Sequence, residues 1–377
     1  MDEPRTLVFV FLRGGMDGLN TVVPTFDERY RALRPTLALS ARRAGLAESG
    51  KALPLDERFA LHPSLEPLLP LYRDGRLAIA HAVGSDDDTR SHFEAQDQLE
   101  HGASVRRPLA GGFLARWLRT REDAGALSAL AFGRAVPESL RGAPSVTALE
   151  SLADIRLNTV AGRERRFAEA LGSLYAERRA PGGAELARAG RDALALLERV
   201  RDVGSSAEPG VSYPDSAFAR SLSQIARLVR AEVGLRAAAV DQGFYDSHVA
   251  QDPLLSSQLA QLAEGLAAFD ADLGTLRERV TVVCMTEFGR RTYENAGLGT
   301  DHGRASCAFL LGGGVRGGRV VADWPGLGDD DREGPGDLRV TTDYRDVLFE
   351  VLARRFAAAD PETVFPGLVH RAPGLVA

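Results

Sequence analysis

The chain has 377 residues, 46 Lys and Arg against 52 Asp and Glu, a formal net charge of −6 at pH 7, and two cysteines. This acidic balance argues against a nucleic-acid-binding protein, which needs a basic face, and two cysteines exclude a disulfide framework or a Cys-rich zinc site. No apolar run approaches the roughly 18 residues of a membrane span. Lys51 is the sole lysine, which leaves almost no candidate for a lysine nucleophile or a P-loop.

The strands predicted along the chain are short apolar runs. The first covers 6–12, and its continuous apolar character is typical of a strand buried on both faces, as in a parallel sheet. Similar runs follow at 77–83, 127–132, 237–240, 279–285 and 306–311, and a last strand is expected at 319–322. Helical periodicity lies between them, at 64–74, 184–202, 216–233 and 253–276.

This alternation, with glycine-rich loops after strands, predicts an α/β fold: a mostly parallel sheet with helices on both faces. Residues 204–215 and 325–338 are the expected long loops. We expect a single domain over 1–377, with a helical cap or insertion at about 140–235. The N-terminus shows no basic segment followed by a cleavage site, which predicts a cytoplasmic protein or one that has lost its leader.

Chemistry-bearing side chains follow the predicted strands, and in open α/β sheets sites form at the carboxyl ends of strands. In chain order these residues are Asp17, Ser91 with His92, Asp241, Asp246, His248, Glu287, Arg290, and Asp301 with His302. Carboxylates and imidazoles together suit divalent ions such as Zn²⁺, Mn²⁺ or Mg²⁺. A hydroxyl beside such an ion is activated and would attack phosphorus or sulfur.

Several of these residues also have a structural interpretation. Asp17 lies among glycines, as turn aspartates do. Ser91, with Glu94 three residues on, forms the pattern of a helix capping box. The i, i+2 pair that begins at Asp246 fits a surface loop equally well. His81 lies inside an apolar strand, which favours a core histidine.

Five motifs are spaced along nearly the whole chain: RGGMDGLN at 13–20, SHFEAQ at 91–96, GFYDSH at 243–248, TEFGR at 286–290 and GTDHG at 299–303. In this order they resemble the blocks of a bacterial family called domain of unknown function 1501, as does VTTDYRD at 340–346. That family is placed in the alkaline phosphatase and sulfatase superfamily. The resemblance implies a large doubly wound sheet with two metal sites at its carboxyl edge.

The resemblance also implies roles for individual residues. Ser91 takes the place of the superfamily's nucleophile, and the metal ligands carried over by position are Asp17 and Glu287 for one ion and Asp246, His248 and His302 for the other, with Asp301 a further candidate. The superfamily usually has Asp-His where this chain has Glu287-Phe288. One site is therefore a ligand short, and Arg290 could supply a fixed positive charge in place of that ion.

Together these features predict a metal-dependent hydrolase of phosphate or sulfate esters, with Ser91 and Arg290 as catalytic residues and one or two ions of Zn, Mn or Mg. The expected partner is a small-molecule ester. An alternative, favoured by Phe288, is a degenerate member that binds a metal, a ligand or a partner protein without turnover, and a phosphomutase would share the fold. Many family members carry a twin-arginine export leader, so a periplasmic or exported location follows if one has been removed.

Overall fold

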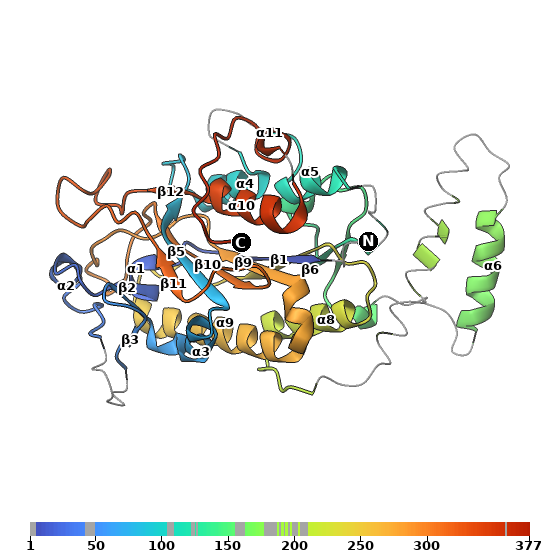
Figure 1. Ribbon diagram of the computed structural model, residues 1–377, viewed down its shortest axis with the longest axis horizontal. Coiled ribbons are helices and arrows are strands. Elements are labelled where there is room, and N and C mark those ends of the chain that lie inside the picture. Colours follow the sequence, from blue (N-terminus) through green and yellow to red (C-terminus); the bar gives the residue numbers. More distant parts are fainter. Residues whose placement is uncertain are drawn as a thin grey trace.

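The computed structural model describes residues 5–41, 50–103, 109–121, 127–154, 163–176, 210–358 and 360–377, with single positions between 125 and 203. Most of the helix predicted at 184–202 and the first half of the loop predicted at 204–215 lie outside these residues. Of the predicted insertion, the described elements include β7 (Thr147–Leu149), η3 (Leu152–Asp154) and α6 (Glu164–Ala176), which stands apart from the sheet in Figure 1. Its role as a cap stays a prediction.

A single large sheet crosses the molecule and confirms the predicted α/β class. Its strands lie in the order β11-β5-β10-β9-β1-β8-β6-β7, and β12 pairs with β5. Their bounds are β11 (Arg319–Val321), β5 (Leu77–Gly84), β10 (Ser306–Gly312), β9 (Val280–Met285), β1 (Thr6–Leu12), β8 (Ala237–Gln242), β6 (Ala129–Phe132) and β12 (Thr342–Asp343). All strand pairs of this sheet are parallel except the two that β10 makes.

The antiparallel direction of β10 determines which loops lie together at one edge of the sheet. Because β10 runs against its neighbours, its first residue, Ser306, pairs with Val83 near the end of β5. The loop that precedes β10 therefore lies at the same edge as the loops that follow β1, β5, β8 and β9. This edge is where an α/β sheet usually carries its site.

Helices cover both faces of the sheet, as predicted (Figure 1). One face carries η1 (Pro63–Leu68), α3 (Leu69–Arg73), α8 (Ala217–Arg230) and α9 (Gln251–Leu273), and the other carries α4 (His92–His101), α5 (Phe113–Arg119), α10 (Tyr344–Phe356) and α11 (Pro361–Val364). The remaining elements are α1 (Gly18–Thr21), α2 (Arg29–Leu33), η2 (Glu138–Leu140), η4 (Gly274–Arg279) and a small sheet of β2 (Val22–Pro24), β4 (Phe59–Leu61) and β3 (Leu53–Pro54). None of the described helices is long and apolar enough to cross a membrane.

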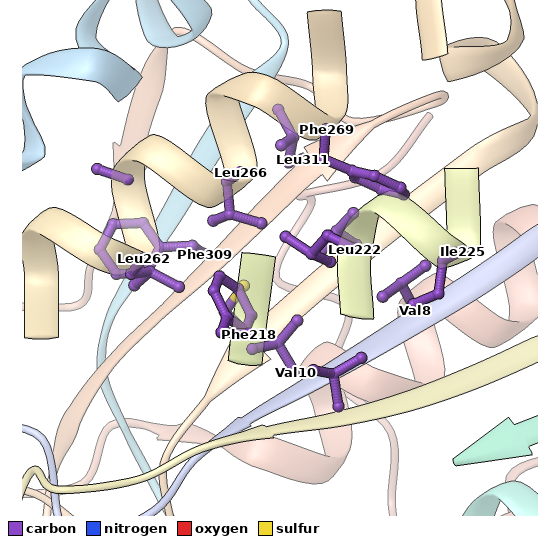
Figure 2. Close-up of a cluster of buried hydrophobic side chains, with 14 of the residues drawn as sticks. Val8, Val10, Phe218, Leu222, Ile225, Leu262, Leu266, Phe269, Phe309 and Leu311 are labelled. Carbon is purple, nitrogen blue, oxygen red and sulfur yellow. The ribbon is translucent and has the colours of Figure 1, made fainter. Parts of the chain in front are cut away.

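Strand β1 shows why its sequence is apolar throughout. Successive side chains point to opposite faces of a strand, so Val8 and Val10 join one core while Phe9 and Phe11 join the other. Figure 2 shows the first core, in which side chains of α8 and α9 pack over Val8 and Val10. Because both faces of β1 are buried, its sequence lacks the alternation of apolar and polar residues that a half-exposed strand would have.

His81 lies in β5 and is a satisfied core histidine, as expected. Its Nδ1 accepts a hydrogen bond from the N–H of Ala82 at 2.7 Å, and its Nε2 donates to the carbonyl of Val22 at 2.9 Å. Burial lowers the pKa of His81 to about 4. Burial also lowers the pKa of His62, the N-cap of η1, to about 4.

The loop after β1 ends in a buried ion pair. Asp17 caps α1 by accepting from the N–H of Leu19 at 3.2 Å. Its other oxygen accepts from the guanidinium of Arg34 at 2.5 Å and from the amide of Gln251 at 2.5 Å. The side chains of Asp17 and Arg34 are both fully buried. Asp17 thus serves as a helix cap and as the partner of Arg34, and its role as a metal ligand stays a prediction.

We expect acid to destabilise the protein through His81. Because its pKa is about 4 in the folded state and 6.5 otherwise, the unfolded chain binds more protons as the pH falls below 6.5. The free energy of unfolding should therefore fall by about 2 kcal/mol between pH 7 and pH 5 on account of this side chain. Urea unfolding at both pH values measures the loss. His81→Gln should lower stability at pH 7 but lose less on acidification, and an equal loss would contradict the assignment.

We expect Arg34→Met to destabilise the fold strongly, because it leaves the carboxylate of Asp17 buried without its counter-ion. Removing one partner of a buried ion pair costs about 3–5 kcal/mol. Arg31→Met is the matched control, since Arg31 is exposed in the adjacent helix α2. Urea unfolding compares the two variants, and similar midpoints would show that the pair adds nothing.

Candidate metal centre

Three histidines from three segments direct their Nε2 atoms at one carboxylate, that of Asp246. The Nε2 of His248 lies 3.1 Å and that of His302 lies 3.2 Å from Oδ1 of Asp246. The Nε2 of His92 lies 3.4 Å from Oδ2. One ligand atom each from His92, Asp246 and His302 lies within 4.8 Å of the others. We call these three residues, together with His248, the metal cluster.

The opposite nitrogen of each ring is held by a fixed oxygen. Nδ1 of His92 lies 2.8 Å from the carboxylate of Glu287, Nδ1 of His248 lies 3.2 Å from the carboxylate of Asp301, and Nδ1 of His302 lies 2.9 Å from the carbonyl of Arg90. These oxygens can only accept, so each Nδ1 carries a proton, and a ring that stays neutral has its Nε2 lone pair free for a cation beside Asp246. Metal-binding histidines in proteins are oriented in this way.

Two contacts at the Nε2 atoms suggest that the cluster could hold a cation. Among the described residues, Nε2 of His92 is buried without a hydrogen-bond partner. Nε2 of His248 and Nε2 of His302 lie 2.9 Å apart, so two lone pairs face each other unless a proton or a cation lies between them. The hydrogen bond to the carboxylate of Glu287 raises the pKa of His92. Three imidazoles and a carboxylate are ligands that Zn²⁺ and similar ions take.

The carboxylate of Glu287 contacts Nδ1 of His92, on the side of the ring away from Asp246. Burial would raise its pKa, but hydrogen bonds from His92 and Gln96 prevail and lower it. The buried carboxylate also accepts from the N–H of Gly14 at 2.9 Å and from the hydroxyl of Thr286 at 2.9 Å. With both oxygens engaged by the protein, Glu287 orients His92, and its direct binding of an ion stays a prediction.

The guanidinium of Arg290 holds the carboxylate of Asp246. Its buried guanidinium donates to Oδ1 of Asp246 at 2.7 Å. It also donates to four backbone carbonyls, those of Gly14, Gly15, Tyr245 and Thr300. Burial would raise the pKa of Asp246, but the hydrogen bond and charge of Arg290 prevail and lower it to about 2. Arg290 therefore keeps Asp246 ionised and fixes its direction, and its predicted catalytic role stays a prediction.

Ser91 is the N-cap residue of α4, immediately before His92. The capping box expected with Glu94 is wrong, because the Ser91 side chain makes no cap hydrogen bond. The turn before it is strained: Arg90 has φ of +54° and is held by an ion pair with the buried carboxylate of Asp337. Ser91, half-buried, thus directly precedes the cluster residue His92 at the start of α4.

His92 is the cluster residue that the sequence did not single out as a ligand. A signal was present, because His92 and Gln96 are four residues apart and so share one face of α4. Both side chains contact the same carboxylate, that of Glu287. Phe288 packs beside this group, with its ring centroid 4.8 Å from that of His92 and 4.9 Å from that of His302.

Solved structures resemble this chain at low identity. The PsFucS1 sulfatase from Pseudoalteromonas sp. is 12% identical, with a TM-score of 0.42 over 100% of this chain and 72% of that chain. The zinc complex of the C-terminal periplasmic domain of EcEptC from Escherichia coli is 10% identical, with a TM-score of 0.38 over 83% and 74%. The alkaline phosphatase from the Antarctic bacterium TAB5 is 9% identical, with a TM-score of 0.33 over 83% and 93%. No curated protein matches the chain.

A family model identifies the chain more directly. The model described as "Protein of unknown function (DUF1501)" matches residues 147–368. This span is more than half of the 377 residues and includes Asp246, His248 and His302. The motif blocks along the chain predicted the same family. The chain therefore belongs to the DUF1501 family of proteins of unknown function.

Proposed function

We propose that the protein is a hydrolase of phosphate or sulfate esters that uses one divalent cation held by His92, His248, His302 and Asp246. The observation that carries this proposal is the convergence of three Nε2 atoms on one carboxylate, with the three Nδ1 atoms held by oxygens on the other side of the rings. Such an ion, when bound, polarises the ester oxygens and lowers the pKa of a nearby hydroxyl. Phosphate and sulfate esters gain most from that chemistry because their oxygens carry the charge.

Ser91 is the proposed nucleophile. Its hydroxyl makes no capping hydrogen bond to α4, so the helix does not require it for capping. The first turn of a helix also leaves N–H groups without intrahelical acceptors, and these favour an anion. In the first step a bond forms between Oγ of Ser91 and phosphorus or sulfur, and the bond to the ester oxygen breaks. The alcohol leaves with one proton, and water then releases phosphate or sulfate and restores Ser91.

A single ion suits this chain better than two. Asp17 is engaged by Arg34 and Gln251, and Glu287 by four protein donors. Phe288, which cannot bind a metal, lies against His92 and His302. The same ring supports the second candidate function, a metal-binding member without turnover, which the hydrolysis assay below separates from the first.

We expect the purified protein to bind about one Zn²⁺ or Mn²⁺ per chain, and His92→Ala or His302→Ala to abolish the binding. Glu287→Gln should weaken it by about 10- to 100-fold, because this carboxylate orients His92. Calorimetric titration of the metal-free protein measures the affinity. His101→Ala, at the far end of α4, is the matched control and should bind like the wild type. Equal loss in His101→Ala, or no ion bound by the wild type, would refute the site.

We expect Ser91→Ala to lose at least about 100-fold in hydrolysis of 4-nitrophenyl phosphate or sulfate, as nucleophile removal does. It should still bind the metal, because Ser91 is not a ligand. Ser257→Ala, exposed on α9, is the control and should hydrolyse normally. Full activity in Ser91→Ala would exclude Ser91 as nucleophile, and metal binding without hydrolysis in the wild type would favour the second candidate function. Transfer of phosphate to another alcohol, rather than to water, would indicate a phosphomutase.

A further inference from the structure

Large apolar side chains stand in solvent around the metal cluster. Four of them are the most relevant, and we call them the apolar rim: Phe93, 90% exposed, Phe244, 83%, Val249, 66%, and Leu298, 49%. A single exposed apolar side chain needs no explanation, but several gathered at one functional edge indicate a binding surface.

The rim residues lie in the same segments as the cluster residues. Phe93 directly follows His92, Val249 directly follows His248, and Phe244 is two residues before Asp246. Since consecutive Cα atoms are about 3.8 Å apart, each of these three lies within about 8 Å of a cluster residue, Cα to Cα. The rim is therefore continuous with the metal cluster along the backbone.

Leu298 joins the rim through main-chain pairing. The N–H of Gln251 donates to the carbonyl of Leu298 at 2.9 Å, and the N–H of Ala250 donates to the carbonyl of Gly297 at 2.9 Å. A Cβ on Gly297 would lie 3.4 Å from the side chain of Val249. The loop that carries Leu298 thus lies against the loop that carries His248 and Val249.

Two of the four rim residues have an unfavourable backbone conformation. Phe244 has φ of +70° and Leu298 has φ of +58°, a region that residues with a Cβ rarely adopt, and Ala250, next to Val249, has φ of +48°. The side chain of Asn295 fixes the two loops by donating to the carbonyl of His248 at 3.0 Å. Strain of this kind is concentrated at functional sites, where surrounding contacts maintain it.

Three arginines near the cluster are already paired with carboxylates: Arg13 with Glu100, Arg90 with Asp337, and Arg290 with Asp246. An anionic alcohol would have to compete with these carboxylates for the guanidiniums. An apolar alcohol would instead cover exposed carbon surface.

We propose that the apolar rim binds the alcohol part of the substrate, and that the preferred substrates are phosphate or sulfate esters of an apolar alkyl or aryl alcohol. This inference rests on the proposed function. An ester whose oxyanion lies at the metal cluster has its alcohol directed away from the cluster, because Phe288 and the sheet close the other side. The alcohol then extends toward the exposed side chains next to the cluster in the sequence, among them Phe93 and Phe244.

The test is the hydrolysis of a series of n-alkyl phosphates from ethyl to octyl, kept below their micelle concentrations, by the metal-loaded protein. We expect kcat/KM of the wild type to rise about two- to fourfold for each added CH₂ group that the rim covers. In Phe93→Ser/Phe244→Ser the slope of log kcat/KM against chain length should fall to less than half. Val369→Ser, another exposed apolar residue, is the control and should keep the wild-type slope.

Each other outcome has a definite meaning. Hydrolysis with no dependence on chain length overturns the inference and leaves the hydrolase standing. If neither alkyl phosphates nor alkyl sulfates are hydrolysed, the proposed function fails, and calorimetry then tests whether the rim binds the alcohol part. Tighter binding of octyl than of ethyl phosphate, lost in Phe93→Ser/Phe244→Ser, supports the inference. Equal binding of the two phosphates overturns the inference. If the wild type is a dimer and this variant is a monomer, the rim binds a second copy of the chain, and the inference is overturned.

Discussion

The guanidinium of Arg290 is the contact on which the functional edge depends. It comes from the loop after β9 and donates to carbonyls in the loop after β1, at Gly14 and Gly15, and in the loop after β8, at Tyr245. It also donates to the loop before β10, at Thr300. A planar group with five donors can join several loops at once, which lysine cannot do. Because the same group binds Asp246, the arrangement of the loops and the direction of the carboxylate are set together.

The close approach of these loops explains two glycines of the motifs. Arg290 and His302 face each other in an antiparallel bridge, and the N–H of Gly303 donates to the carbonyl of Gly289 at 2.9 Å. A Cβ on Gly289 would lie 1.9 Å from the carbonyl oxygen of Ala305, and a Cβ on Gly303 would lie 2.5 Å from the carbonyl carbon of Arg290. The two motif segments can therefore pair only with glycine at these positions, and this pairing places His302 beside Asp246.

The sequence predicted the features that depend on local pattern. Continuous apolar runs located β1, β5, β9 and β10, and the rule that sites follow strands selected Asp246, His248 and His302. The sequence could not predict contacts that depend on a long-range partner. The pairing of Asp17 with Arg34 leaves no local signal, since the guanidinium comes from another segment, and the predicted role of Asp17 as a ligand stays a prediction. The inward direction of His92 depends on Glu287, which is distant in the sequence. The antiparallel direction of β10 is likewise invisible in an apolar run.

Charge balance connects the candidate ligands with the kind of substrate proposed. Among the four cluster residues only Asp246 carries a negative charge, so three neutral imidazoles and one carboxylate would leave a bound divalent cation and its ligands with a formal charge of about +1. The neighbouring carboxylates of Glu287 and Asp301, hydrogen-bonded to His92 and His248, reduce that charge, and the guanidinium of Arg290 adds to it. The bound cation and the N–H groups at the start of α4 would attract an anion. The proposed substrate, an ester with an anionic head and an apolar tail, would therefore use both the cluster and the apolar rim.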